Sequence, residues 1–152
     1  MKVLLYQGIS VVSKIIKWQT RSQYSHAAVE LDDSSVIESW HKGVEHVKDY
    51  RTNHTSGTVV DVFGIKAPSE NIDLAESIFL KQVGRKYDFQ GVFNFVTRED
   101  INVDERLFCS ESVMTGFNEA GIYLLERIKP NLVSPRDIHI SPLLYFIEKR
   151  IV

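Results

Sequence analysis

The sequence has little or nothing of several features that mark particular classes of protein: cysteine pairs, long apolar runs and a large net charge. Its 152 residues include a single cysteine, so no disulfide can form within the chain. No apolar run is long enough to span a membrane, and the apolar run at the start of the sequence is too short for a signal peptide. The formal net charge is only -2, which argues against a general affinity for nucleic acid. We therefore expect a cytoplasmic protein, or one delivered by a phage or a secretion system, with no integral membrane segment and no nucleic-acid partner.

The rest of the composition is that of an ordinary globular domain. Hydrophobic residues make up 43% of the chain and charged residues 25%, which is enough apolar material for one core. There is no repeat, no low-complexity tract and no linker. We expect one domain over residues 1–152, and nothing in the sequence indicates the oligomeric state.

The first half of the chain is expected to be mainly strands. Apolar stretches bounded by turn residues predict five strands, at residues 1–6, 24–31, 35–40, 44–47 and 58–63. Helical spacing over residues 12–18 predicts one helix between the first two strands. The turn residues Asp32-Asp33-Ser34 join the second and third strands into a hairpin.

The second half is expected to be mainly helical. Apolar spacing and helix-start signals predict helices at residues 69–84, 89–96, 109–121, 135–138 and 142–150. Ser69 is expected to cap the first of these helices. Ser134 and Ser141 each precede a proline, which is favoured at the first helical position. The charged segment 98–105 is expected to be a surface loop, and the fold class is α+β.

Cys109 stands where an apolar run turns into a helix. The spacing of Val113, Phe117 and Ala120 predicts that this helix starts within a residue of Cys109. The thiol would then face unpaired backbone N–H groups and the positive end of the helix dipole, which favour the reactive thiolate. Its own N–H would serve as an oxyanion donor. The alternative is that Cys109 is a small buried hydrophobic residue.

A cysteine nucleophile needs a base, and histidine is the usual one. The sequence has five histidines, His26, His41, His46, His54 and His139. Four have polar neighbours typical of turns, strand edges or the surface, whereas His26 lies early in an apolar strand. We expect His26 to be the base, with a structural core histidine as the alternative. The spacing of the other histidines matches no common ligand pattern, so we expect no metal and no cofactor.

Glu38 is the candidate for a third group that orients the base. If the hairpin turns through residues 32–34, Ala28 lies opposite Glu38, and His26 becomes a diagonal neighbour of Glu38 at roughly 7–8 Å. Glu30 lies on the same face but about 13 Å along the strand. A slip of one residue in this register would move Glu38 to the other face.

Four short motifs, taken in order, resemble the circularly permuted papain-like amidases, the YiiX-type relatives of the NlpC cell-wall cysteine peptidases. They are YSHAAVEL at 24–31, VIES at 36–39, GRKYDF at 84–89 and FCSE at 108–111. The histidine precedes the cysteine in that group, as it does here. The resemblance implies a permuted papain-like fold, with a small antiparallel sheet or half-barrel packed against helices. It maps the triad of the family onto Cys109, His26 and Glu38.

The expected function is a cysteine hydrolase that cleaves an amide (peptide or N-acyl) or an ester bond through an acyl-enzyme. A cell-wall peptide, a small N-acyl compound and a lipid amide all remain open as substrates. One alternative is a thiol-dependent acyltransferase related to lecithin:retinol acyltransferase, although the Asn-Cys-Glu-His signature of that group does not match residues 108–111. The other is an inactive binding domain of the same fold.

Overall fold

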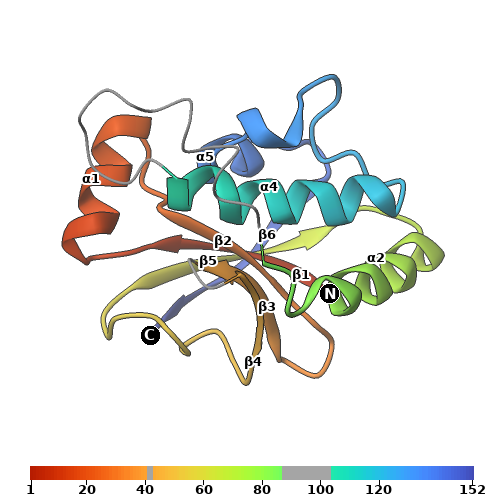
Figure 1. Ribbon diagram of the computed structural model, residues 1–152, viewed down its shortest axis with the longest axis horizontal. Coiled ribbons are helices and arrows are strands. Elements are labelled where there is room, and N and C mark those ends of the chain that lie inside the picture. The colour runs from red at the N-terminus through yellow and green to blue at the C-terminus, as the bar shows by residue number, and fades with distance from the viewer. Residues whose placement is uncertain (41–42, 87–103) are drawn as a thin grey trace.

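A six-stranded antiparallel sheet forms the centre of the computed structural model, which describes residues 1–40, 43–86 and 104–152 (Figure 1). The strands are β1 (Lys2–Gln7), β2 (His26–Glu30), β3 (Val36–Trp40), β4 (Gly43–Val47), β5 (Val59–Ile65) and β6 (Leu144–Ile151). The helices in the described residues are α1 (Val11–Thr20), α2 (Ser69–Gln82), α4 (Asp104–Glu119), α5 (Pro135–His139) and the 3-10 turn η1 (Pro130–Leu132). The strand order is β4-β3-β2-β1-β5-β6, so the sheet stays open. The predicted α+β class is confirmed, as are the five predicted strands of the first half.

The two faces of the sheet bury different sets of side chains. On one face, Leu5 and Ala27 pack with residues of α2 and α4, such as Phe117. Figure 1 shows these helices beside the sheet. On the other face, Leu4 and Ala28 belong to a second buried cluster. Because side chains alternate along a strand, residues 26, 28 and 30 of β2 all lie on this second face.

The β2–β3 hairpin has the register that the sequence predicts. Ala28 lies opposite Glu38, and the backbone N–H of Leu31 donates to the carbonyl of Ser35 at 2.8 Å. The side chain of Asp33 accepts the N–H of Ser35, which closes the turn. This register puts Glu38 on the same face as residue 26.

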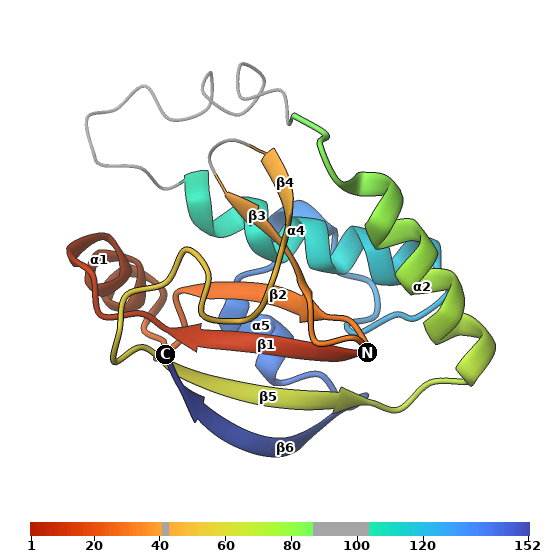
Figure 2. The same ribbon diagram turned by 90° about the horizontal axis from the view of Figure 1, so that it is seen from below.

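The C-terminal segment is a strand, so the helix predicted at 142–150 is wrong. β6 pairs antiparallel with β5, from Leu144 opposite Ile65 to Ile151 opposite Val59. Figure 2 shows β6 at the edge of the sheet beyond β5. Its partner residues are 79 to 92 residues away in the sequence, and pairing of this kind overrides local helical spacing.

The helix that carries Cys109 begins earlier than predicted. α4 starts at Asp104, so Cys109 lies in its second turn rather than at its first residue. Residues 104 and 105 are therefore helical and not part of a surface loop. Only the first four N–H groups of a helix lack an intrahelical partner, and that of Cys109 is beyond them. The helix terminus is therefore not what would activate this thiol.

The predicted caps gave mixed results. Ser134 caps α5 by accepting the N–H of Asp137, whose carboxylate in turn accepts the N–H of Ser134, as expected. Ser69 is the first residue of α2, with Pro68 in the cap position and no side-chain cap bond, so that prediction is wrong. The helix predicted at 89–96 and most of the segment 98–105 lie outside the described residues.

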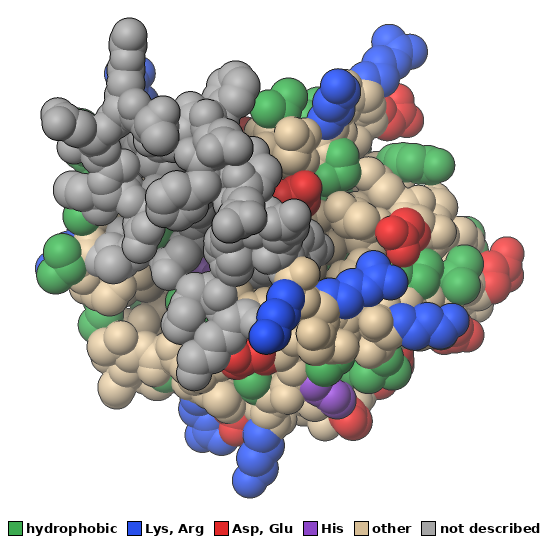
Figure 3. All heavy atoms as spheres, viewed as in Figure 1, with side chains coloured by type: hydrophobic (Ala, Val, Ile, Leu, Met, Phe, Trp, Pro, Cys, Tyr) green, Lys and Arg blue, Asp and Glu red, His purple; other side chains and the backbone are tan. Residues whose placement is uncertain are grey.

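The surface shown in Figure 3 carries acidic and basic side chains interspersed, in keeping with the small net charge. Among the described residues, no helix has the length and apolarity needed to cross a membrane.

Candidate active site

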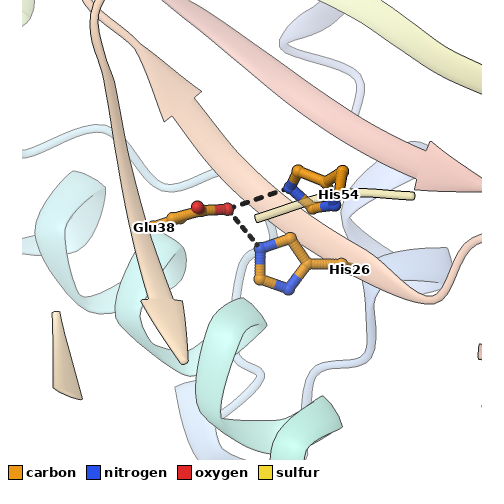
Figure 4. A group of neighbouring side chains, drawn as sticks. All are labelled: His26, Glu38 and His54. Atoms are coloured by element: carbon orange, nitrogen blue, oxygen red, sulfur yellow. Dashed lines mark hydrogen bonds and ion pairs between the residues drawn. The ribbon is translucent and has the colours of Figure 1, made fainter. Parts of the chain in front are cut away.

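The imidazole of His26 and the carboxylate of Glu38 are hydrogen-bonded across the neighbouring strands β2 and β3. His26 is the first residue of β2, and its Nε2 lies 3.1 Å from Oε2 of Glu38 on β3 (Figure 4). An ionised carboxylate only accepts hydrogen bonds, so Nε2 carries the proton and donates it. Their side chains are 8% and 0% exposed. The hairpin register predicted from the sequence is therefore the feature that brings these two groups together.

Cys109 approaches the same imidazole from α4. Its side chain is hydrogen-bonded to that of His26 and also accepts the backbone N–H of Ala27. Because Nε2 of His26 faces Glu38, the bond to sulfur uses Nδ1. The hydroxyl of Ser110 lies 3.9 Å from the sulfur. Cys109, His26 and Glu38 thus form one continuous chain of polar contacts.

The charges in this chain stabilise one another. Burial alone lowers the pKa of His26, but the Cys109 sulfur and the Glu38 carboxylate outweigh it and raise that pKa to about 10. Burial raises the pKa of Cys109, yet its contact with His26 outweighs burial and lowers that pKa overall. The hydrogen bonds from His26 and His54 outweigh burial and lower the pKa of Glu38. These contacts favour an imidazolium at His26 beside the Glu38 carboxylate, and they shift Cys109 toward its thiolate.

His54 is part of the site, although the sequence pointed to a solvated side chain. Its Nε2 lies 3.0 Å from the same Oε2 of Glu38, and its side chain is only 6% exposed. Burial lowers the pKa of His54, with the charge of His26 acting in the same direction. His54 is therefore a neutral N–H donor to Glu38. The other described histidines outside the site, His46 and His139, are exposed as predicted, and His41 lies outside the described residues.

Three further side chains hold this group in place. Asn53 donates to Oε1 of Glu38 at 3.1 Å. The ring of Trp40 stacks on His26 with centroids 4.6 Å apart, and the ring of Tyr6 stacks on His54 at 3.8 Å. Asn53 and His54 belong to the segment between β4 and β5, which folds back over the hairpin. No hydrophobic periodicity in the sequence indicates where such a segment lies. Asn53 and His54 both carry N–H groups, so they could have been considered as hydrogen-bond partners of Glu38.

A cavity of about 430 Å³ adjoins the imidazoles. Its lining includes His26, His54, Trp40, Ser39 and Ser25. Within the described residues, Oγ of Ser39 and Nε1 of Trp40 are buried without a hydrogen-bond partner. Both residues line the cavity, and each of these two groups lacks the partner that buried polar groups usually have.

Glu30 does not take part in this group. Its carboxylate binds Nζ of Lys2 at 2.7 Å and the guanidinium of Arg150 on β6. The two acidic residues on this face of the hairpin therefore have separate partners.

Nitrogen and oxygen atoms of His26, Glu38 and His54 also form a possible set of metal ligands. One ligand atom from each residue lies within 4.8 Å of the others. Imidazole nitrogen and carboxylate oxygen are ligands that zinc commonly takes in proteins.

Comparison with known proteins supports the fold but assigns no family. No protein-family profile matches the chain, and no curated protein matches it in sequence. Among solved structures, the fold is similar to that of the metalloprotein YiiX from Escherichia coli O157:H7, with a TM-score of 0.67. The similarity covers 98% of this chain and 96% of YiiX, at 19% sequence identity. The chain therefore has a YiiX-type fold.

Proposed function

We propose that this protein is a cysteine hydrolase that cleaves an amide or ester bond through an acyl-enzyme, with Cys109 as nucleophile. The observation that carries the proposal is the position of His26, whose imidazole contacts the Cys109 sulfur on one side and Glu38 on the other. A base held between a nucleophile and a carboxylate is the arrangement that activates a thiol. The resemblance of the motifs to permuted papain-like amidases supports the same chemistry.

In the first half of the proposed reaction, the Cys109 thiolate attacks the substrate carbonyl carbon and forms a tetrahedral intermediate. His26 then donates its Nδ1 proton to the leaving nitrogen or oxygen, and the bond from that atom to the carbonyl carbon breaks. The products are a free amine or alcohol and a thioester on Cys109. Neutral His26 next accepts a proton from water as the water attacks the thioester. The acid leaves, and the thiolate and imidazolium are restored.

Glu38 acts on this reaction through His26. Its hydrogen bond fixes the direction of the ring, and its charge favours the imidazolium that accompanies the thiolate. Asn53 and His54 hold the carboxylate from two other directions, at 3.1 and 3.0 Å. Glu38 is therefore a positioning residue with little freedom to turn away.

The substrate is expected to carry polar acceptors, because two donors in the cavity wall have no protein partner within the described residues. These are Oγ of Ser39 and Nε1 of Trp40. A peptide or an N-acyl compound has carbonyl oxygens that could accept from both. An entirely apolar acyl chain would leave them unsatisfied, which costs about 1–3 kcal/mol for each group.

The test is to detect the thiolate and then its acylation. The ultraviolet absorbance of the thiolate is compared between the wild-type protein and Cys109→Ser over a pH range, a measurement that needs no access to the buried sulfur. The proposal expects a thiolate at neutral pH, followed by mass-detected acetylation of Cys109 by p-nitrophenyl acetate. An ordinary thiol titration with no acetylation would refute it.

A metal-dependent function is the second candidate. The similar structure is described as a metalloprotein, and His26, Glu38 and His54 offer a fitting donor set here. These three side chains would hold the ion, which when bound supplies a Lewis acid and lowers the pKa of a coordinated water. Turnover that survives a chelator but is lost in Cys109→Ala supports the thiol mechanism. The reverse pattern supports the metal.

A further inference from the structure

We propose that His26, Glu38 and His54 form a divalent transition-metal site that shares His26 with Cys109, so that metal binding and thiol chemistry exclude each other. The proposed metal site is argued from the geometry of these three side chains alone. Only the exclusion rests on the proposed hydrolase function.

The geometry favours a metal with nitrogen and oxygen ligands. Both Nε2 atoms converge on the same carboxylate oxygen, at 3.1 and 3.0 Å. In a tetrahedral site with bonds of about 2.0–2.2 Å, neighbouring ligand atoms lie about 3.3 Å apart. These two distances are close to that spacing and all three ligand atoms lie within 4.8 Å of one another, so an adjustment of the side chains would exchange two N–H donors for one ion. Two imidazoles and a carboxylate suit zinc, cobalt and nickel better than calcium or magnesium.

The surroundings already orient the three ligands, as partners outside a metal site usually do. Asn53 holds Oε1 of Glu38, which leaves Oε2 for the ion. The stacked ring of Tyr6 fixes the plane of His54. The adjoining cavity, lined by both histidines, provides a route for the ion and room for a water in the remaining position.

The exclusion follows from the single lone pair of Nε2. A metal needs that lone pair, so the Nε2 proton of His26 must leave to solvent when the ion binds. The ring then keeps only its Nδ1 proton and cannot be an imidazolium. Cys109 then faces a ring whose Nδ1 proton is much harder to release than that of an imidazolium, because its release would leave an imidazolate.

The metal site is tested by titrating the untagged protein with Co²⁺ and following the visible ligand-field spectrum. One ion per chain is expected, and His54→Phe should weaken binding at least about tenfold while keeping a ring against Tyr6. His46→Gln is the matched control, because His46 is an exposed histidine on β4 outside the site, and it should bind as wild type does. Equal binding by wild type and His54→Phe would overturn the site. Loss of binding in Cys109→Ser would also overturn it, because sulfur would then be a ligand.

The exclusion is tested by labelling Cys109 with iodoacetamide at a fixed pH. One equivalent of Zn²⁺ should slow labelling of the wild type at least about tenfold, and a chelator should restore it, whereas His54→Phe should not respond. Unchanged labelling with the site filled would overturn the exclusion. If the thiolate absorbance is absent and Cys109 is not acetylated but Co²⁺ still binds, the hydrolase proposal fails and the metal site stands.

Discussion

Glu30 and Glu38 are buried carboxylates on the same face of neighbouring strands, with 1% and 2% of their surface exposed, yet their partners differ. Glu30 binds the ammonium group of Lys2 and the guanidinium group of Arg150. Glu38 binds the imidazoles of His26 and His54, a type of side chain whose ring nitrogens can donate or accept a proton.

The difference shows that burial of a charge does not by itself mark a reactive site. The ion pairs of Glu30 join the first strand to the last, because Lys2 lies on β1 and Arg150 on β6. An ion pair can stabilise a fold without taking part in proton transfer. The Glu38 group adjoins a cavity and a thiol, and in the proposed reaction His26 carries a proton to and from the substrate. We therefore propose a structural role for the Glu30 region and a chemical role for the Glu38 region.

The largest effect expected on the Glu38 side comes from removing the nucleophile or the base. Cys109→Ala and His26→Ala should each lower acylation by p-nitrophenyl acetate roughly 10⁴-fold or more, because nucleophile and base act as a unit. Thermal melts provide the control for folding. A near-normal rate in Cys109→Ala would place the reaction elsewhere, and collapse of the melting temperature in His26→Ala would make His26 a structural residue.

The difference in role between Glu30 and Glu38 is tested by changing each of them to glutamine. Glu38→Gln should lower the acylation rate roughly 10²-fold and lower the pKa of His26, since it removes the charge that favours the imidazolium. Glu30→Gln should leave both nearly unchanged. Rates and NMR titration of the His26 ring are the measurements. Should Glu30→Gln be the damaging change, the division between the two regions is wrong.

Of the two histidines bound to Glu38, the sequence predicted the one that lies on the same hairpin. His26 and Glu38 are separated by a turn whose residues define the register, so local rules were sufficient to bring them together. His54 was missed because its position depends on a long segment that returns over the sheet. Its polar neighbours suggested exposure, whereas Glu38 and Tyr6 bury its ring.

The errors in the fold have the same physical origin. The last strand exists because it pairs with β5, far away in sequence, and because Arg150 reaches Glu30. Its local apolar spacing was compatible with a helix. The start of α4 was misplaced because the apolar periodicity begins at Cys109, while the first turn is formed by charged residues that carry no such pattern.

On the Glu30 side, the expected effect is on stability. Glu30→Gln should lower the free energy of unfolding by about 2 kcal/mol, since hydrogen bonds to charged partners contribute about 1.5–3 kcal/mol and Lys2 is partly screened by solvent. For a chain of this size, the melting temperature should fall by about 4–8 °C. Calorimetry at neutral pH measures this. A melting temperature of Glu30→Gln equal to that of wild type would show that these ion pairs contribute nothing to the stability of the fold.

The two regions should also respond to different ranges of pH. The pKa values of both carboxylates are lowered in the fold, so the stability that the carboxylates themselves contribute is lost only as the pH falls below about 4.3, where the unfolded chain takes up protons. The pKa of His54 is lowered as well, with burial as the main cause and His26 as a second. The unfolded chain therefore binds a proton at residue 54 below pH 6.5 that the folded protein does not.

This difference predicts a loss of stability between pH 6.5 and 5 that comes from the Glu38 region alone. The loss should be at most about 1.4 kcal/mol per pH unit, and it should shrink in His54→Phe but persist in Glu30→Gln. Urea denaturation at several pH values gives the required free energies. If the unfolding free energy depends on pH in the same way in wild type and His54→Phe, His54 is not held neutral.

The smallest expected effect concerns the cavity, which adjoins Glu38 and not Glu30. Nε1 of Trp40 has no hydrogen-bond partner within the described residues, and its ring stacks on His26. Trp40→Phe keeps an aromatic ring over His26 but removes the N–H, so the thiolate titration should not change. If a substrate oxygen accepts from Nε1, KM should rise about three- to tenfold for the best substrate in a panel of peptides, N-acyl amides and esters, as expected for one neutral hydrogen bond. If nothing accepts from it, the same substitution should leave KM unchanged and stabilise the protein, because an unsatisfied buried donor has been removed.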